Sequence, residues 1–224
     1  QYLYGPSKTA RIGDDTYVVS DLAANFIWDG GGKDTLSAQG LSTSVTLYLD
    51  PGYWGYVGAK SDLITANGQV TVNFGTVIEN LIGGSGDDHL YGNGVDNAIT
   101  GGLGNDVIDG GVGIDKAVYQ GLKSQYVITK QSDGSFTIQD TMSGRDGTDR
   151  LTNVEYVAFN DITLDLSAPK PSKGDFNADG HGDILLQNIL DGSCYAWELN
   201  GLSLVNGGNG YVGWTPGADW HVVT

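Results

Sequence analysis

The sequence is poor in basic residues, in cysteine and in long apolar runs. Its 224 residues include 11 Lys and Arg against 27 Asp and Glu, a formal net charge of −16. Such a surplus repels phosphate groups, so it argues against nucleic acid as a partner and favours a cation. Cys194 is the only cysteine, which excludes an intramolecular disulfide. No apolar stretch approaches the roughly 20 residues of a membrane span, so we expect no membrane insertion.

Signatures of catalysis are also missing. There are only three histidines, His89, His181 and His221, and no HExxH zinc-protease motif occurs. Neither a G-x-S-x-G elbow nor a phosphate-binding Walker loop is present. Carboxylates are plentiful, but glycosidase chemistry needs two of them across a cleft. We therefore expect that this chain is not an enzyme by itself and that it binds no zinc.

Glycine, by contrast, is abundant. The 36 glycines are about twice the average usage for a chain of this length. An acidic, glycine-rich composition is compatible with disorder. However, 39% of the residues are hydrophobic and 10% are aromatic. This is enough apolar material for a packed core and for one or two domains.

Many of the glycines belong to an internal repeat. From Gly83 the sequence divides into four nine-residue lines, numbered one to four: GGSGDDHLY (83–91), GNGVDNAIT (92–100), GGLGNDVID (101–109) and GGVGIDKAV (110–118). The sixth position is always Asp or Asn, namely Asp88, Asn97, Asp106 and Asp115. The eighth position is aliphatic, namely Leu90, Ile99, Ile108 and Ala117. A flexible glycine linker would show neither periodicity.

Each line predicts a glycine-rich turn followed by a three-residue strand. Glycine permits backbone angles that let carbonyl oxygens turn inward. The sixth-position side chain adds an oxygen, and the eighth-position side chain points into the interior. Two lines make one 18-residue turn of a parallel coil, so line one stacks on line three and line two on line four. Six or more oxygen ligands from flexible turns favour calcium, whereas zinc prefers nitrogen or sulfur.

The four lines resemble the GGxGxDxUx repeat of RTX (repeats-in-toxin) proteins, which forms a calcium-bound parallel β-roll. The resemblance extends over residues 1–118, about half of the chain. It is carried by QYLYG (1–5), ARIGDDTY (10–17), IWDGGGKDT (27–35) and VIENLIGGSGDDHLYGN (77–93). These motifs are similar to the region that follows the catalytic domain in serralysin-type secreted zinc metalloproteases.

The resemblance implies calcium ligands at the matching positions. A first cage takes oxygens of Arg11, Gly13, Asp15, Asp29, Gly31 and Asp34, and a second those of Gly32, Asp34, Val77 and Glu79. In the repeat, a third cage places Gly84, Gly86 and Asp88 opposite Gly101, Leu103 and Asp106. A fourth places Asn93, Val95 and Asn97 opposite Gly110, Val112 and Asp115. Asp15 stands where the family more often has Thr, and Asn97 lowers the charge of the fourth cage.

The segments on either side of the repeat read as β-structure. Alternating patterns predict strands at 44–49 and 69–74 upstream, and at 126–130, 135–139 and 161–166 downstream. The downstream segment resembles the β-rich cap that closes many RTX rolls. A solenoid needs such a unit to cover its last apolar layer, and three alternating apolar residues suit that purpose, namely Val154, Val157 and Phe159.

These features predict an all-β fold. A parallel β-roll is flanked by β-sandwich-like and capping strands, with a small C-terminal β segment. We divide the chain into a β-rich region at 1–82, the nonapeptide β-roll at 83–118, its cap at 119–168, and a linker with a partial calcium-loop segment at 169–224.

The last segment contains an isolated acidic loop, DFNADGHGD (175–183). It places oxygen donors at Asp175, Asn177, Asp179 and Asp183, with a carbonyl from His181. An EF-hand loop follows the same logic but ends with Glu at position twelve and is flanked by helices. Here the following residues, ILLQN (184–188), read as a strand. The segment therefore resembles a calcium loop of FG-GAP-type β-propeller repeats, and we expect calcium binding there too.

Two functions are compatible with these features. In the first, the chain is the calcium-binding C-terminal module of a secreted metalloprotease, preceded by a catalytic domain. It would fold on calcium outside the cell and support type I secretion. In the second, it is an extracellular adhesion module whose Trp197, Trp214 and Trp220 engage a polysaccharide or a protein. The sequence stops within strand-like residues, so we expect it to continue, with a secretion signal beyond Thr224.

Overall fold

The computed structural model describes residues 11–167 in full and, further along, the backbone of five short strands between 184 and 222. The chain divides into two compact units, Gln1–Leu166 and Ser167–Thr224. The described residues form β-strands and one short 3-10 helix, η1 (Lys123–Gln125), with no α-helix among them. No helix in this part of the chain is long and apolar enough to cross a membrane.

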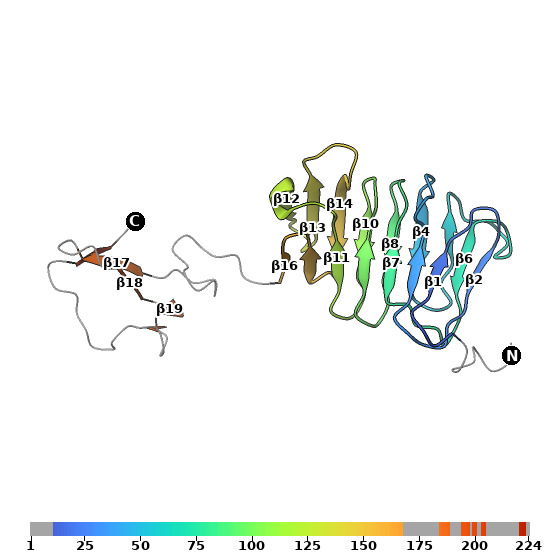
Figure 1. The fold of residues 1–224 in the computed structure, drawn as a ribbon, viewed down its shortest axis with the longest axis horizontal. Helices are drawn as coiled ribbons and strands as arrows, with labels where there is room; N and C mark the ends of the chain where they lie inside the picture. The colour runs from blue at the N-terminus through green and yellow to red at the C-terminus, as the bar shows by residue number, and fades with distance from the viewer. Residues whose placement is uncertain are drawn as a thin grey trace. The chain divides into compact units, whose positions relative to one another are not determined.

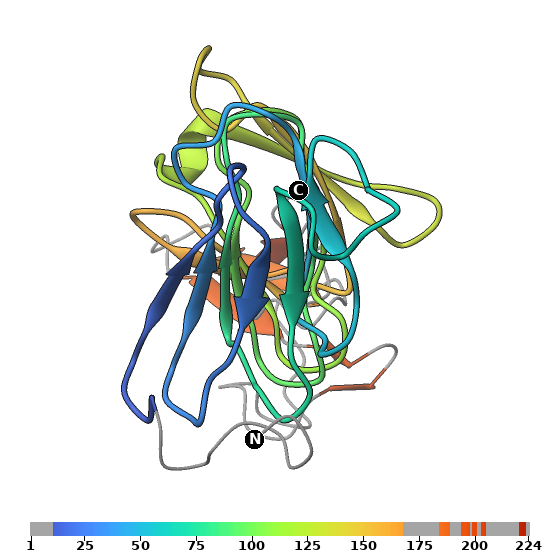
Figure 2. The same cartoon turned by 90° about the vertical axis from the view of Figure 1, so that its right-hand side faces the viewer.

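The first unit consists of two β-sheets that face each other as two layers (Figures 1 and 2). Sheet A has the strand order β1 (Thr16–Val18), β3 (Thr35–Ser37), β7 (Asn80–Ile82), β9 (Ala98–Thr100), β11 (Lys116–Val118), β15 (Tyr156–Ala158) and β16 (Thr163–Asp165). Sheet B has the order β12 (Tyr126–Lys130), β13 (Phe136–Asp140), β14 (Thr148–Thr152), β10 (Val107–Asp109), β8 (His89–Tyr91), β4 (Val45–Tyr48), β5 (Gly55–Val57), β6 (Gln69–Val72) and β2 (Asn25–Ile27).

The nonapeptide lines form the middle of both sheets. Their last three positions are the strands β8 to β11, and the chain alternates between the sheets from one line to the next. β8 pairs in parallel with β10, with Leu90 opposite Ile108, and β9 pairs with β11, with Ile99 opposite Ala117. The predicted stacking of line one on line three, and of line two on line four, is therefore confirmed. All four eighth-position side chains are at most 1% exposed and fill the interior of the roll.

The same parallel pairing continues beyond both ends of the repeat. Upstream, β3 pairs with β7, and Leu36 lies opposite Leu81. Downstream, β10 pairs with β14, and Ile108 lies opposite Leu151. These side chains are as deeply buried as those of the repeat. The coil of stacked turns therefore continues upstream of residue 83 and downstream of residue 118.

Two antiparallel insertions interrupt the coil without changing its register. β5 and β6 lie between β4 and β2 in sheet B, and β12 and β13 extend the same sheet beyond β14. The strand predicted at 126–130 coincides with β12. The other four predicted strands correspond to β4, β6, β13 and β16, with ends that differ by one or two residues.

The cap covers the last apolar layer of the coil, as its sequence predicts. Val154, Val157 and Phe159 are 8%, 0% and 7% exposed. Phe159 packs against Tyr119 and Tyr126, with ring centroids 5.7 and 4.8 Å apart. This aromatic group closes the downstream end of the space between the sheets.

The second unit is described only through its strands. β17 (Ile184–Asn188) pairs in antiparallel fashion with β18 (Cys194–Trp197) and with β21 (Trp220–Val222). A separate pair joins β19 (Leu199–Asn200) to β20 (Ser203–Leu204). The strand predicted at 184–188 is confirmed. The acidic loop lies outside the described residues, and so do its five candidate ligands Asp175, Asn177, Asp179, His181 and Asp183.

Candidate metal centres

The sixth position of each turn, next to the start of its strand, forms a column of polar side chains in each sheet. We call these the A column and the B column. The A column, in front of sheet A, contains Asp15, Asp34, Glu79, Asn97, Asp115 and Glu155. The B column contains Asp88, Asp106 and Asp149.

One hydrogen bond recurs along both columns. The backbone N–H of Asp88 donates to Asp106 Oδ1 at 2.8 Å, and the N–H of Asp106 donates to Asp149 Oδ1 at 2.9 Å. In the A column the same bond, at 2.8 Å, joins Asp15 to Asp34, Asp34 to Glu79, Asn97 to Asp115 and Asp115 to Glu155. Each bond uses one side-chain oxygen, and a carboxylate has a second oxygen left for another partner.

The first predicted cage brings three carboxylates together. Asp15, Asp29 and Asp34 each place one oxygen within 4.8 Å of the others. Asp29 and Asp34 are 2% and 0% exposed, so their negative charges are held in the interior. The Tyr17 hydroxyl donates to Asp29 at 2.8 Å and fixes its orientation. The N–H of Gly31 also donates to Asp29, at 2.6 Å.

The backbone predicted for this cage lies next to the carboxylates. The carbonyl of Arg11 accepts an N–H from the 29–34 turn at 3.1 Å. Gly32 has a φ of +149°, and a Cβ atom there would overlap the carbonyl oxygen of Gly13. The residues of the first cage are therefore brought together.

In the second predicted cage, the side chain of Val77, whose carbonyl is the expected ligand, lies at the surface with 46% of the residue exposed.

In the third predicted cage the turns of lines one and three touch through their glycines. A Cβ atom on Gly102 would overlap the carbonyl oxygen of Gly84, and one on Gly104 that of Gly86. Gly102 and Gly104 also have positive φ values of +103° and +114°. Both the close approach of the turns and the backbone conformation therefore require glycine at these positions. The N–H of Leu103 donates to Gly84 at 3.1 Å. The structure thus brings together the predicted group Gly84, Gly86, Asp88, Gly101, Leu103 and Asp106.

The fourth predicted cage resembles the third in its backbone contacts, but it contains the amide side chains of Asn93 and Asn97. The N–H of Val112 donates to the Asn93 carbonyl at 3.0 Å, and the Val95 carbonyl lies against Gly113. Asn97 Oδ1 accepts the N–H of Asn93 at 2.8 Å, and its Nδ2 donates to Asn93 Oδ1 at 3.1 Å. Asn97 Oδ1 thus accepts one hydrogen bond and keeps a second acceptor site, but the side chain carries no charge. This leaves Asp115, opposite it near Gly110, as the charged group of the cage.

Three carboxylate oxygens of the columns are buried without a hydrogen-bond partner: Asp34 Oδ2, Asp106 Oδ2 and Asp115 Oδ2. Burial raises the pKa of Asp106 to about 8 and the pKa of Asp34 and Asp115 to about 6 each. A buried, unpaired anion is costly, so each of these groups requires a proton or a cation.

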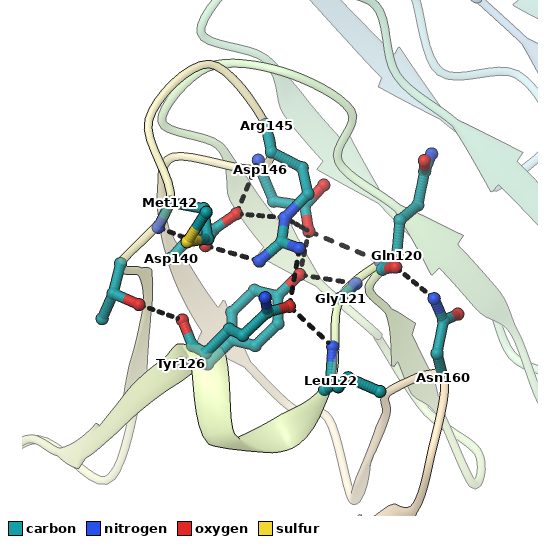
Figure 3. A network of polar contacts seen from close by, with 11 residues as sticks. Gln120, Gly121, Leu122, Tyr126, Asp140, Met142, Arg145, Asp146 and Asn160 are labelled. Atoms are coloured by element: carbon teal, nitrogen blue, oxygen red, sulfur yellow. Dashed lines mark hydrogen bonds and ion pairs between the residues drawn. The ribbon is translucent and has the colours of Figure 1, made fainter.

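The protein does not supply that cation within residues 11–167. The ion pairs in this range are made by Arg145 with Asp140 and Asp146, and by Arg150 with Asp133, all in the cap. Figure 3 shows Arg145 beside Asp140 and Asp146. In the columns, the carboxylate oxygens instead accept hydrogen bonds from backbone N–H groups.

Two members of the columns, Asp149 and Glu155, are absent from the sequence-based ligand set. Both continue the recurring hydrogen bond beyond line four. A signal for Asp149 exists: GRDGTDRLT (144–152) carries Gly at its fourth position, Asp at its sixth and Leu at its eighth, like the nonapeptide lines. It follows line three by 43 residues because the β12–β13 hairpin is inserted between them.

Comparison with known proteins agrees with this architecture. A family model described as peptidase M10 serralysin C terminal matches residues 7–164. Serralysin of Proteus mirabilis is 33% identical over 113 residues, which is 44% of this chain and 22% of that protein. With the same coverage, serralysin G of Dickeya chrysanthemi is 35% identical and metallopeptidase AprA of Pseudomonas marginalis is 34% identical. The chain spans about a fifth of the length of these relatives. Because the family model covers well over half of it, the chain belongs to the peptidase M10 serralysin C-terminal family.

Proposed function

We propose that this chain is the calcium-binding RTX module on the C-terminal side of a secreted, serralysin-like metalloprotease. The observation that carries the proposal is the set of buried, unpartnered carboxylate oxygens of Asp34, Asp106 and Asp115. Each of them immediately precedes or begins the strand of a stacked turn, Asp34 and Asp115 in the A column and Asp106 in the B column, as expected for cation sites repeated along a coil. We place several calcium ions in the four cages predicted from the sequence.

Calcium fits the donors that the structure assembles. The column side chains offer carboxylate and amide oxygens, and the glycine turns between them offer carbonyl oxygens. This all-oxygen set from flexible turns matches calcium and not zinc. Bound calcium would supply positive charge to the columns and hold neighbouring turns together. Asp15, Asp29, Asp34 and Glu79 would do most of this upstream, and Asp88, Asp106 and Asp115 within the repeat.

Calcium binding would be coupled to folding. Without a cation, column carboxylates such as Asp88 and Asp106 repel each other at 0% and 1% exposure, which favours the unfolded chain. Calcium binds only the folded columns and shifts the equilibrium toward them by mass action. We therefore propose that the chain stays unfolded at low cytosolic calcium, leaves the cell by type I secretion, and folds outside.

The relatives that carry the names serralysin and metallopeptidase are much longer than this chain. We propose that a catalytic domain precedes the module in the complete protein and that the module itself is not catalytic. The complete sequence decides this point. An HExxH motif within the preceding couple of hundred residues supports a protease. Several DFNxDG repeats after Thr224 without such a motif support the adhesion alternative and an FG-GAP-like role for 175–183.

Circular dichroism tests the calcium proposal directly. The purified chain is measured with chelator and then with millimolar calcium, with magnesium at the same concentration as the control. We expect a clear gain of β-signal with calcium and little with magnesium, which gives up its water shell reluctantly. An identical spectrum in chelator and in calcium would contradict the proposal.

A further inference from the structure

Aromatic side chains line an open groove beside the strands β4, β5 and β6 of sheet B. The groove has a volume of about 490 Å³, which is within the range of sites for small ligands. None of its residues belongs to the A column or the B column. We call it the aromatic groove, and its lining residues are Pro51, Gly52, Tyr53, Trp54, Lys60 and Phe74.

A buried glutamine holds two sides of the aromatic groove in place. Gln69, on β6, is 2% exposed. Its Oε1 accepts the indole N–H of Trp54 at 2.8 Å and the backbone N–H of Ser61 at 3.1 Å. Its Nε2 donates to the carbonyl of Ala59 at 3.2 Å. One buried side chain therefore fixes the indole ring and the backbone on either side of Lys60.

The two exposed rings of the groove are also held by neighbours. Tyr53, 57% exposed, stacks on Tyr48 with ring centroids 5.3 Å apart, and Tyr48 stacks on Tyr91 at 4.6 Å. Phe74, 75% exposed, lies against Gly52, where a Cβ atom would come within 2.5 Å of its ring. Fixed rings lose little conformational entropy when a ligand covers them. An exposed aromatic surface of this kind is typical of a binding site.

Lys60 is the one charged side chain that lines the groove. Its Nζ lies 4.8 Å from the centroid of the Trp54 ring, which attracts the ammonium group. Among the residues that the structure describes, Lys60 makes no ion pair, so its N–H donors are available to a partner. In a chain with a formal net charge of −16, this lysine beside aromatic rings favours an anionic ligand with an apolar face.

We propose that the aromatic groove binds an acidic sugar unit of a polysaccharide. The flat face of a sugar ring presents C–H groups, which pack on the rings of Trp54, Tyr53 and Phe74, while its hydroxyl groups stay in water. The sugar carboxylate accepts hydrogen bonds from the Lys60 ammonium. This site goes beyond the proposed calcium-binding function, because none of its residues is a predicted calcium ligand. It would hold a protein that carries this module at an acidic polysaccharide.

An NMR titration of the full chain in saturating calcium tests the proposal. The probe is a hexasaccharide of alternating glucuronic acid and N-acetylglucosamine, and the neutral comparison is the hexamer of N-acetylglucosamine. The indole N–H signal of Trp54 is assigned by its loss in Trp54→Phe. We expect this signal to shift with the acidic sugar, and the neutral sugar to bind about 10-fold more weakly because it lacks the charge-assisted hydrogen bond. An unchanged signal, or equal affinity for the two sugars, would overturn the proposal.

A matched pair of lysine substitutions separates the groove from charge in general. Lys130 Nζ lies 5.4 Å from the centroid of the Phe136 ring, on the β12–β13 hairpin, and so repeats the lysine–ring contact elsewhere. We expect Lys60→Gln to weaken binding of the acidic sugar about 10-fold and to remove the preference over the neutral one. Lys130→Gln should bind like the unchanged chain. Equal affinities in these two variants would contradict the site.

The exposed ring of Phe74 tests the stacking part of the proposal. Phe74→Ala removes an exposed side chain, so we expect the calcium-bound fold to be retained and both sugars to bind more weakly. Circular dichroism in calcium checks the fold of every variant. If the unchanged chain gains no β-signal with calcium, the proposed function fails. If it folds with calcium and the acidic sugar does not bind, only the groove proposal fails.

Discussion

The nonapeptide roll (83–118) and the cap (119–168) both bury carboxylates, but some carboxylates of the cap have arginine partners. Arg145 Nε lies 2.6 Å from Asp140, whose side chain is fully buried. Arg150 Nη2 lies 2.6 Å from Asp133 at the surface. In the roll, Asp106 receives a backbone N–H and no arginine or lysine within the described residues. The same residue type therefore has a cationic side chain as partner in one region and none in the other.

For this reason the pKa of Asp106 moves in the opposite direction to the pKa values of the arginine-paired Asp140 and Asp133. Burial raises the pKa of Asp106 to about 8. For Asp140 burial acts in the same upward sense, but hydrogen bonds led by Arg145 outweigh it and lower the pKa. Hydrogen bonds from Ser135 and Arg150 lower the pKa of Asp133 to about 2. Asp140 and Asp133 of the cap thus have an arginine as countercharge, whereas Asp106 of the roll has none.

Removal of calcium should affect the two regions unequally, and this is the largest effect we expect. In chelator, the amides of β8 to β11 should exchange at least about 100-fold faster than in saturating calcium, because each bound ion stabilises only the folded columns. The β12–β13 hairpin should lose less protection. Hydrogen-exchange mass spectrometry on peptides from 83–118 and 126–140 measures both. Equal loss in the two regions would show that the cap has no stability of its own.

Single substitutions in line three sharpen the comparison. Asp106 is 1% exposed and belongs to the B column, whereas Asp109 lies on β10 and holds Gly111 and Asn153 through its Oδ1. We expect Asp106→Ala to weaken calcium binding by roughly 10- to 100-fold or more, and Asp109→Ala by much less. Calorimetric titration with calcium checks this. Similar affinities in the two variants would mean that the register of the ligands is wrong.

Glycine substitutions compare the packing of the two regions. Gly102 and Gly134 both have positive φ, +103° and +89°. A Cβ atom on Gly102 would overlap Gly84, whereas one on Gly134, in the β12–β13 turn, meets nothing within 4 Å. Alanine at Gly134 should cost about 1–2 kcal/mol for the backbone conformation alone. Alanine at Gly102 should cost more, about 3 kcal/mol, because the stacked turns must also separate. Urea unfolding in calcium measures the difference.

Much of this architecture is predictable from the sequence because the repeat is periodic. The burial of Leu90 and Ile108, the stacking of alternate lines and the columns led by Asp88 all follow from the nine-residue spacing. The upstream turns are harder to predict, because β5 and β6 separate β3 from β7 in sequence while leaving Leu36 opposite Leu81. Pairing register is set by burial and side-chain hydrogen bonds, so an insertion that bulges outward leaves it intact.

The same reasoning explains why Asp149 escapes a sequence-based ligand set. Its line, 144–152, has the right residues at the fourth, sixth and eighth positions but no glycine pair at its start. The bonds of the Asn97 amide are equally hidden, since only the structure shows that it both accepts from and donates to Asn93. Spacing therefore identifies the columns, while three-dimensional contacts decide which oxygens remain free for an ion.

The smallest expected effect is a pH dependence of opposite sign for buried carboxylates without an arginine partner and for those that have one. In the metal-free folded chain, Asp106 and Asp149 have pKa values of about 8 and 7, above about 3.9 in the unfolded chain. The folded state then binds more protons than the unfolded state between about pH 4 and 8, so its stability falls as pH rises through this window. For Asp133, with a pKa of about 2, the stabilising contribution is present above about pH 4 and lost toward pH 2. The β-signal of the metal-free chain in circular dichroism should fall from pH 5 to 8, because deprotonation of these carboxylates favours the unfolded chain, and it should fall less in Asp106→Asn. A β-signal that rises over this range without calcium would mean that Asp106 is already paired.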